Sequence, residues 1–168
     1  MDPQAEDERF MALAYAEAVA AGLRHEVPVG AVLVGADGTV LARAGNRTIE
    51  LSDPSAHAEV LALRAAGVRQ GNYRLVGATL FVTLEPCLMC MGAMIHARLA
   101  RLVFGALDPK AGAAVSRYRI GCDQLLNHSL AIAHGPMACV CGELLSDFFR
   151  ARRSGGKGRG GEGAGEAH

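Results

Sequence analysis

Two cysteines stand three residues apart in the segment TLEPCLMC (residues 83–90), directly after Pro86. Because proline favours the first position of a helix, the segment predicts that Cys87 and Cys90 lie in the first helical turn and share one face. Unpaired backbone N–H groups at a helix start favour the thiolate form of cysteine, which is the form that binds metals. The pair alone is compatible with a metal site, a redox pair or two buried cysteines.

The segment SAHAEV, at the predicted start of another helix, supplies the other half of a metal site. His57 offers a neutral imidazole, which zinc binds readily beside thiolates. Glu59 follows two residues later, and residues i and i+2 of a helix point to different faces, which favours an acid–base group over a ligand. One histidine and two cysteines make three ligands. Structural zinc sites use four, whereas catalytic sites leave one position for water, so the set predicts catalytic zinc.

A closed structural site would need a fourth ligand, and three further cysteines are candidates: Cys122, Cys139 and Cys141. One residue separates the last two on a predicted helix, which sends their side chains in different directions, and free cysteine is commonly a small buried apolar group. Four further histidines have no comparable partners nearby in the sequence: His25, His96, His128 and His134. The structural site therefore stays as the less favoured alternative.

The rest of the chain supplies elements that can hold these residues. Helical periodicity and start and stop signals alternate with apolar strand patterns, and Ala36-Asp37-Gly38 is a hairpin turn signal. Helices that separate strands predict a layered α/β domain with about five strands, paired in parallel after the opening hairpin. Helices are expected at 6–21, 54–67, 86–97 and 137–153, strands at 27–46 (the hairpin), 78–85, 101–106 and 130–135, and a loop at 105–118.

Length and composition indicate one globular domain. The 168 residues are 51% hydrophobic and 20% charged, with a formal net charge of zero, which argues against a disordered chain and a general nucleic-acid coat. The sequence lacks the apolar run of a membrane helix and the pattern of a signal peptide, so we expect a cytoplasmic protein. The glycine-rich end has no large apolar side chain, and we predict a folded domain at 1–153 followed by disorder at 154–168.

Positive charge gathers just before and within this tail. Arg150, Arg152, Arg153, Lys157 and Arg159 lie within ten residues without an acidic neighbour. Such a cluster either creates a positive field that attracts a polyanion or is a solvated helix end followed by a soluble tail. Charge alone leaves both interpretations open.

The order His-Ala-Glu at 57–59 and Pro-Cys-x-x-Cys at 86–90 resembles the zinc deaminase signature. Further blocks resemble the bacterial tRNA-specific adenosine deaminases of the cytidine/deoxycytidylate deaminase superfamily, over about residues 10–153: EVPVGAVLV, DPSAHAEVLALR, NYRL, ATLFVTLEPCLMCMGAMIHAR, VFGALDPKAGAA and LLSDFFRARR. The resemblance implies a three-layer α/β/α fold with a central mixed sheet, one zinc ion per subunit and a homodimer. It also implies conversion of wobble adenosine in a tRNA anticodon stem-loop to inosine by a zinc-bound hydroxide, with no organic cofactor and no membrane.

The resemblance also assigns roles to individual residues. It implies that His57, Cys87 and Cys90 bind zinc, that Glu59 transfers protons, and that Asn46 hydrogen-bonds the target base. The expected contacts with the RNA loop and its phosphates are Asp108, Lys110, Asn127, Phe149, Arg150 and Arg153.

Two other functions use the same motif. A deaminase of free bases or nucleosides would have the same metal site but no need for a basic last helix, and a zinc-stabilised interaction module would not need Glu59. The segment SRYRIGCDQLL (116–126) departs from the family pattern at the expected border of the RNA cleft.

Overall fold

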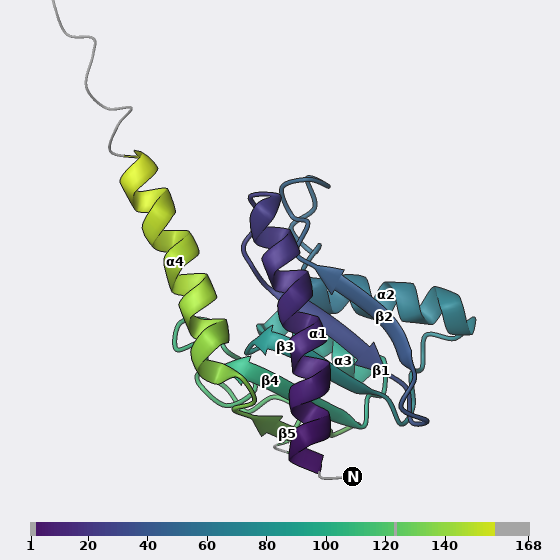
Figure 1. The fold of residues 1–168 in the computed structure, drawn as a ribbon. Helices are drawn as coiled ribbons and strands as arrows, with labels where there is room; N and C mark the ends of the chain where they lie inside the picture. The colour runs from purple at the N-terminus through teal and green to yellow at the C-terminus, as the bar shows by residue number, and fades with distance from the viewer. Residues whose placement is uncertain (1–2, 123, 157–168) are drawn as a thin grey trace, which may run out of the picture.

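The structure, a computed structural model, describes residues 3–122 and 124–156 and contains one sheet flanked by helices (Figure 1). The elements are α1 (Pro3–Leu23), β1 (Gly30–Val34), β2 (Val40–Gly45), α2 (Ala58–Gln70), β3 (Thr79–Leu84), α3 (Leu88–His96), β4 (Arg101–Ala106), β5 (Ala131–His134) and α4 (Ala138–Gly156).

The sheet is mixed, with strand order β2-β1-β3-β4-β5. The predicted hairpin of β1 and β2 is antiparallel, and β3, β4 and β5 are parallel to one another. The prediction of parallel pairing after the hairpin is wrong at one position, because β3 pairs antiparallel with β1. The connection through α2 returns the chain in the direction of β2 but places β3 on the other side of β1. As a result β2, β3, β4 and β5 all end at the same edge of the sheet, which we call the carboxyl edge.

Two hydrophobic cores cover the two faces of the sheet. Strand side chains alternate between them, with Leu80 and Val82 in the core under α2 and α3, and Phe81 in the core under α1 and α4. This period-two alternation is what a strand buried on both faces requires. Figure 1 shows α1 and α4 on the near face of the sheet. The three-layer α/β/α fold with five strands is therefore confirmed.

Helix α1 packs closely on the sheet for two reasons. A Cβ atom at Gly30 would collide with the carbonyl oxygen of Ala14, so only glycine allows β1 and α1 to approach this far. Asp7 accepts two hydrogen bonds of 2.7 Å from the guanidinium of Arg101 at the start of β4. The first helix is thereby fixed to two strands that are distant from it in the sequence.

Three helices extend beyond the predicted ends, and α2 also starts four residues later than predicted, at Ala58. Helix α1 spans Pro3–Leu23 where 6–21 was expected. Helix α2 passes through Gly67 and stops before Gly71, whose φ of 63° is the left-handed conformation that ends many helices. Helix α4 continues to Gly156, and the hydroxyl of Ser154 donates to the carbonyl oxygen of Arg150, so residues 154–156 belong to a helix and not to the predicted disordered tail. The rest of that tail, 157–168, lies outside the described residues. None of the described helices is both long and apolar enough to cross a membrane.

Candidate active site

His57 and Cys87 lie at the residues just before α2 and α3, at the carboxyl edge of the sheet. Both have extended backbones (φ −72°, ψ 150° and φ −78°, ψ 174°), and neither side chain caps its helix. Their carbonyl oxygens accept the first helical hydrogen bonds, from Leu61 and Met91, each at 3.0 Å. The prediction that Cys87 lies in the first helical turn is therefore wrong by one residue. The extended conformation turns each side chain away from its own helix and leaves its donor atom free.

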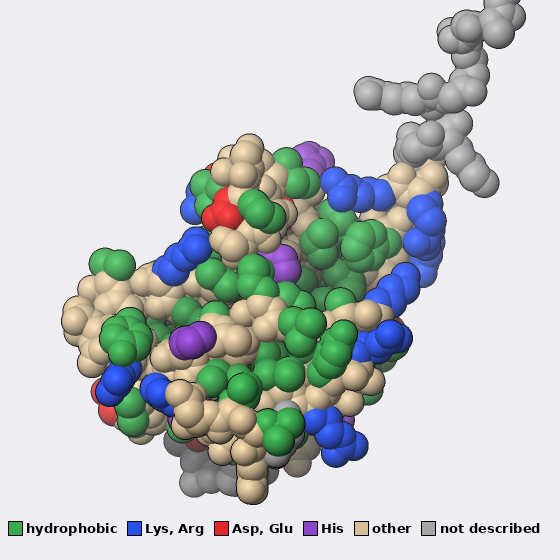
Figure 2. All heavy atoms as spheres, turned by 180° about the vertical axis from the view of Figure 1, so that it is seen from behind, with side chains coloured by type: hydrophobic (Ala, Val, Ile, Leu, Met, Phe, Trp, Pro, Cys, Tyr) green, Lys and Arg blue, Asp and Glu red, His purple; other side chains and the backbone are tan. Residues whose placement is uncertain are grey.

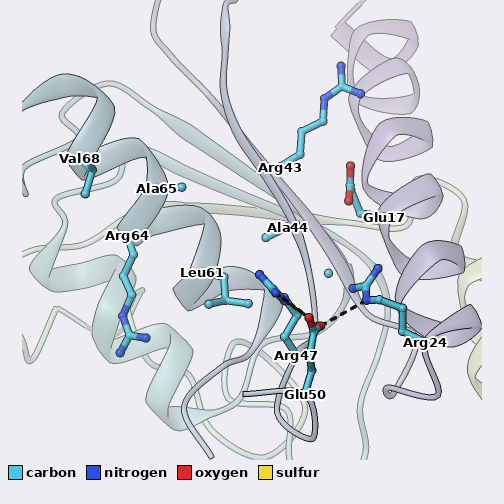
Figure 3. A pocket seen from close by; sticks show the side chains of 11 residues that line it. Glu17, Arg24, Arg43, Ala44, Arg47, Glu50, Leu61, Arg64, Ala65 and Val68 are labelled. Carbon is cyan, nitrogen blue, oxygen red and sulfur yellow. Dashed lines mark hydrogen bonds and ion pairs between the residues drawn. The ribbon is translucent and has the colours of Figure 1, made fainter. Parts of the chain in front are cut away.

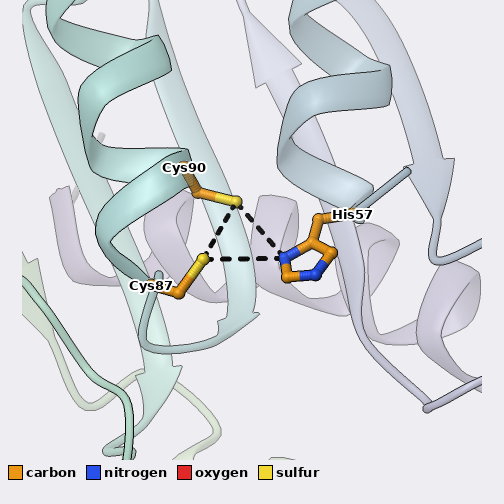
Figure 4. A group of neighbouring side chains, drawn as sticks. All are labelled: His57, Cys87 and Cys90. Atoms are coloured by element: carbon orange, nitrogen blue, oxygen red, sulfur yellow. Dashed lines mark hydrogen bonds between the residues drawn. The ribbon is translucent and has the colours of Figure 1, made fainter. Parts of the chain in front are cut away.

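The side chains of His57, Cys87 and Cys90 converge from two helices, and we call them the His-Cys-Cys cluster (Figure 4). The two sulfurs are 3.7 Å apart, and Nδ1 of His57 is 3.7 Å from Sγ of Cys87 and 3.5 Å from Sγ of Cys90. Tetrahedral zinc, with Zn–S of about 2.3 Å and Zn–N of about 2.0 Å, separates two sulfurs by about 3.8 Å and sulfur from nitrogen by about 3.5 Å. The donors thus fit zinc in type and in spacing.

The alternatives to a catalytic metal centre fit the cluster less well. A disulfide needs sulfurs about 2.05 Å apart, so the cysteines are free thiols. Over residues 3–122 and 124–156, the donors close enough to share one ion are these three. Cys141 is buried in the core under α1 and α4, and Cys122 and Cys139 are exposed elsewhere. No fourth cysteine of the described chain closes the site.

The two thiols of the cluster differ in acidity. Their mutual hydrogen bond lowers the pKa of Cys87 to about 4, against the effect of burial and with help from His57. The same bond and burial raise the pKa of Cys90. The hydrogen bond with Cys87 also raises the pKa of His57 above its usual value. Without a cation the cluster favours a thiolate at Cys87 and a neutral thiol at Cys90. A divalent cation among the donors would stabilise both thiolates.

Glu59 lies in the first turn of α2 and is only 4% exposed. Its Oε2 atom is buried and has no hydrogen-bond partner among the described residues. Burial raises the pKa of Glu59, while its own backbone N–H and the charge of His57 act in the opposite direction. Because His57 lies outside the helix, the i, i+2 spacing does not force the two side chains apart. A buried carboxyl with a free oxygen beside metal donors is suited to proton transfer.

Asn46 connects the end of β2 to the start of α2. Its Oδ1 accepts the backbone N–H of Ala58 at 2.8 Å, and its own N–H donates to the carbonyl oxygen of Val29 at 3.0 Å. Asn46 is 7% exposed, and the side-chain hydrogen bond that it forms within the described residues is made by Oδ1. Asn46 therefore has a fixed position next to His57 and a donor that remains free.

Most of the predicted RNA-contact residues meet in one groove of about 630 Å³ between α4 and the loop that follows β4. Asp108 and Lys110 line it from the loop, and Phe149, Arg150 and Arg153 line it from α4. Phe149 is 39% exposed, so an aromatic face is available inside this basic groove. The groove combines apolar surface with guanidinium groups, as surfaces that bind single-stranded nucleic acid do.

The structure does not bring Asn127 to this groove. Arg98 donates hydrogen bonds of 3.2 Å to the backbone and side-chain oxygens of Asn127. Arg98 follows the end of α3, close to the start of β4, so it lies at the opposite edge of the sheet from the His-Cys-Cys cluster. The sequence reasoning could not anticipate this, because the long connection between β4 and β5 crosses from one edge to the other.

A larger cavity, of about 800 Å³, lies along the outer edge of β2 between α1 and α2 (Figure 3). Arginines dominate its charged lining, but several are already paired. Glu50 receives two hydrogen bonds from Arg47, of 2.7 and 2.9 Å, and lies 3.7 Å from Arg24. Arg64 lies 3.5 Å from Asp53. These ion pairs hold the segment between β2 and α2 from its outer side.

Comparisons with known proteins relate the whole domain to one family. The model of the cytidine and deoxycytidylate deaminase zinc-binding region matches residues 4–106. The tRNA-specific adenosine deaminase of Agrobacterium fabrum is 49% identical over 89% of this chain and 97% of its own length, and that of Haemophilus influenzae is 47% identical over 88% and 85%. A solved structure from "Biochemical and Structural Studies of A-to-I Editing by tRNA:A34 Deaminases at the Wobble Position of Transfer RNA" is 49% identical, with a TM-score of 0.79 over 82% of this chain and 99% of that one.

Proposed function

Since the chain belongs to the cytidine and deoxycytidylate deaminase family, and within it to the tRNA-specific adenosine deaminases, we propose that it converts wobble adenosine in tRNA to inosine and releases ammonia. The observation that carries the proposal is a His-Cys-Cys cluster with the spacing of zinc ligands beside a buried glutamate, in a chain with this family membership. A tRNA substrate also supports a cytoplasmic location.

We assign zinc to His57, Cys87 and Cys90. When bound, zinc lowers the pKa of a coordinated water to about 7 and so supplies a nucleophile at neutral pH. The chain's contribution is a fixed triangle of donors at the starts of two helices, with His57 just before α2, Cys87 just before α3 and Cys90 in the first turn of α3, where backbone N–H groups favour thiolates. The fit of donor type and spacing described above supports this assignment.

Glu59 is the group that we assign to proton transfer. Its Oε2 has no hydrogen-bond partner among the described residues, and burial raises the pKa of the carboxyl above its usual value. It would take one proton from the water and deliver it to N1 of adenine, then take the second proton from the new C6 hydroxyl and deliver it to the amino group as the C6–N bond breaks. Hydrolysis balances in this way, since adenosine and water give inosine and ammonia.

Asn46 is our candidate for holding the base. Its Oδ1 is occupied by Ala58, so Nδ2 is the atom available to donate to a ring nitrogen of adenine. Because the same side chain is tied to the start of α2, it would fix the base relative to His57.

The groove between α4 and the loop after β4 is our candidate for the anticodon loop. RNA recognition favours unpaired bases stacked on aromatic side chains, with phosphates held by cations. Phe149 offers the aromatic face, Arg150 and Arg153 the cations, and Asp108 and Lys110 the polar opposite wall. Asn127 is not part of this surface.

Replacing Arg150 and Arg153 together by alanine is expected to weaken tRNA binding and its salt dependence. Each lost phosphate contact removes about 0.7 from the slope of log affinity against log salt for single-stranded RNA, so the slope should fall by about 1.4. The measurement is a titration of labelled anticodon stem-loop at several salt concentrations. Arg152→Ala is the matched control, because Arg152 lies on the same helix but over the Phe148 ring. An equal loss in the control, or an unchanged slope in the double variant, would reject the groove.

We also propose a homodimer that forms through the outer surface of α2 and α3. Figure 2 shows hydrophobic side chains gathered on this face, and a groove of about 570 Å³ runs between the two helices. Val68, Tyr73 and Leu88 are 84%, 68% and 48% exposed there. Large exposed apolar patches mark interfaces. Sedimentation equilibrium is expected to give twice the 17.5 kDa mass of the chain, and a monomeric mass at micromolar concentration would contradict the dimer.

The activity itself is tested with a tRNA that carries adenosine at the wobble position. After incubation, the RNA is digested and inosine is measured by mass spectrometry, with the same tRNA carrying guanosine at that position as the control. Inosine formation from the first tRNA alone is the expected result. Conversion of free adenosine, with the tRNA unchanged, would instead identify a nucleoside deaminase.

A further inference from the structure

Two glutamates that sequence reasoning did not single out are buried near the candidate active site. Glu26 is 1% exposed and Glu85 is 2% exposed. Within the described part of the chain neither forms an ion pair within 4.0 Å. A buried carboxylate without a cation is costly unless hydrogen bonds replace its water, so the donors around each glutamate indicate what each one holds.

Glu85 is surrounded by the loop that follows β4. Its Oε1 accepts the backbone N–H groups of Val115 and Ser116, each at 2.8 Å. Its Oε2 accepts the N–H of Asp108 at 3.0 Å and the hydroxyl of Ser116. A Cβ atom at Gly112 would collide with the carboxylate. Residues 108–116 therefore wrap around the Glu85 carboxylate, and their hydrogen bonds to it fix the conformation of the segment.

This loop is also fixed to the His-Cys-Cys cluster. Glu85 and Pro86 directly precede Cys87, and the carbonyl oxygen of Pro86 accepts the N–H of Ala113 at 2.8 Å. On the other side of the loop, Asp108 and Lys110 line the groove assigned to RNA. Segment 108–116 is thus one wall of the groove, and its position relative to the His-Cys-Cys cluster depends on the contacts of Glu85.

Glu26 has the same relation to the segment between β2 and α2. Its Oε1 accepts the N–H groups of Ile49 and Glu50, at 2.9 and 2.8 Å, and its Oε2 accepts the hydroxyl of Thr48 at 3.1 Å. The segment begins at Asn46 and ends at His57. Figure 3 shows Arg24 and Arg47 holding Glu50 from the outer side.

Neither carboxylate is available for chemistry. A carboxylate has about four acceptor positions, and each of the two glutamates accepts four hydrogen bonds, those of Glu26 coming from three donor groups because the N–H of Ile49 is shared between both oxygens. Burial acts to raise the pKa of both groups, but the hydrogen bonds outweigh it and the pKa of each lies below its usual value. The oxygens of both glutamates are thus occupied by donors from neighbouring segments, in contrast to Glu59 with its free oxygen.

We propose that Glu26 and Glu85 are positioning residues, each of which shapes one wall of the substrate cleft. Glu85 fixes the wall at 108–116, which presents Asp108 and Lys110, and Glu26 fixes the wall at 46–57, which presents Asn46. The proposal rests on the proposed function where it calls these walls RNA-binding, but their dependence on the two carboxylates is independent of the substrate.

The first test replaces Glu85 by glutamine, which has the same shape but turns an N–H₂ group toward N–H donors. We expect faster amide hydrogen exchange at 108–116 alone, unchanged zinc content, and a KM for tRNA that rises about tenfold with a smaller change in kcat. Gly112→Ala perturbs the same wall without a change of charge and should reproduce this pattern. Glu8→Gln, at an exposed carboxylate on α1, is the control and should behave as the wild type.

Glu26→Gln is expected to accelerate amide hydrogen exchange at 46–57 and to leave 108–116 protected, with a fall in kcat because Asn46 loses its fixed position.

Unchanged exchange at 108–116 in Glu85→Gln, or at 46–57 in Glu26→Gln, would overturn the proposal, as would zinc loss in Glu85→Gln. If Glu85→Gln fails to fold, Gly112→Ala decides, and a wild-type KM with that variant overturns the role of the first wall. A wild-type enzyme that leaves tRNA unedited rejects the proposed function, but the exchange measurements still test the walls.

Discussion

Glutamine in place of Glu59 is expected to stop deamination while zinc and tRNA remain bound. The substitution keeps the volume of the buried side chain but removes the only group that we assign to proton transfer. A positioned acid–base group contributes about 10²- to 10⁴-fold, and since Glu59 would serve more than one proton transfer, we expect a loss in kcat of about 10⁴-fold. The measurement is single-turnover formation of inosine from wobble adenosine at saturating enzyme.

Two measurements separate this role from a structural one. Zinc content and the dissociation constant for the anticodon stem-loop should equal those of the wild type, and Asp37→Asn, at an exposed turn carboxylate, should keep full activity. If Glu59→Gln retains a rate within tenfold of the wild type, the proton passes through another group and the assignment is wrong.

Alanine in place of Cys90 is expected to release zinc and abolish activity together. Cys90 is fully buried, and its sulfur lies 3.7 Å from that of Cys87 and 3.5 Å from Nδ1 of His57. Its removal leaves two donors, which is fewer than zinc enzymes use. Metal analysis of the purified variant should find little zinc, and no inosine should form.

Cys141→Ala is the matched control for this substitution. Cys141 is also buried, at 4% exposed, but it packs in the core on the opposite face of the sheet. It should cost some stability through the small cavity that it leaves, while zinc and activity remain. Full zinc occupancy in Cys90→Ala would show that another donor set holds the metal.

The convergence of His57, Cys87 and Cys90 could be predicted from the sequence. One imidazole and two closely spaced thiols, each at a predicted helix start, are a set of groups suited to binding one metal ion. The sheet of five strands and its flanking helices followed from local periodicity for a similar reason. The starts of α2 and α3 were less accessible. Pro86 resembles the first residue of a helix, but the following cysteine has an extended backbone, and a local preference does not reveal that its side chain must turn toward another helix.

The positions that the sequence did not disclose depend on contacts between distant segments. Glutamate is usually a surface residue, so its type did not mark Glu26 or Glu85 as buried. The packing of loops around these two side chains is what makes them buried acceptors. The antiparallel pairing of β1 with β3 depends on the side of β1 on which the chain re-enters the sheet. Asn127 lies at the edge of the sheet opposite the His-Cys-Cys cluster, because the connection between β4 and β5 crosses from one edge to the other.

The placement of the cluster on the ends of two helices has a consequence for how this protein is made. No short stretch of a newly synthesised chain contains all three donors, because His57 and Cys87 are separated by α2 and β3. Zinc can be held by all three donors only when the starts of α2 and α3 have come together, so its binding free energy stabilises the folded chain over the unfolded one.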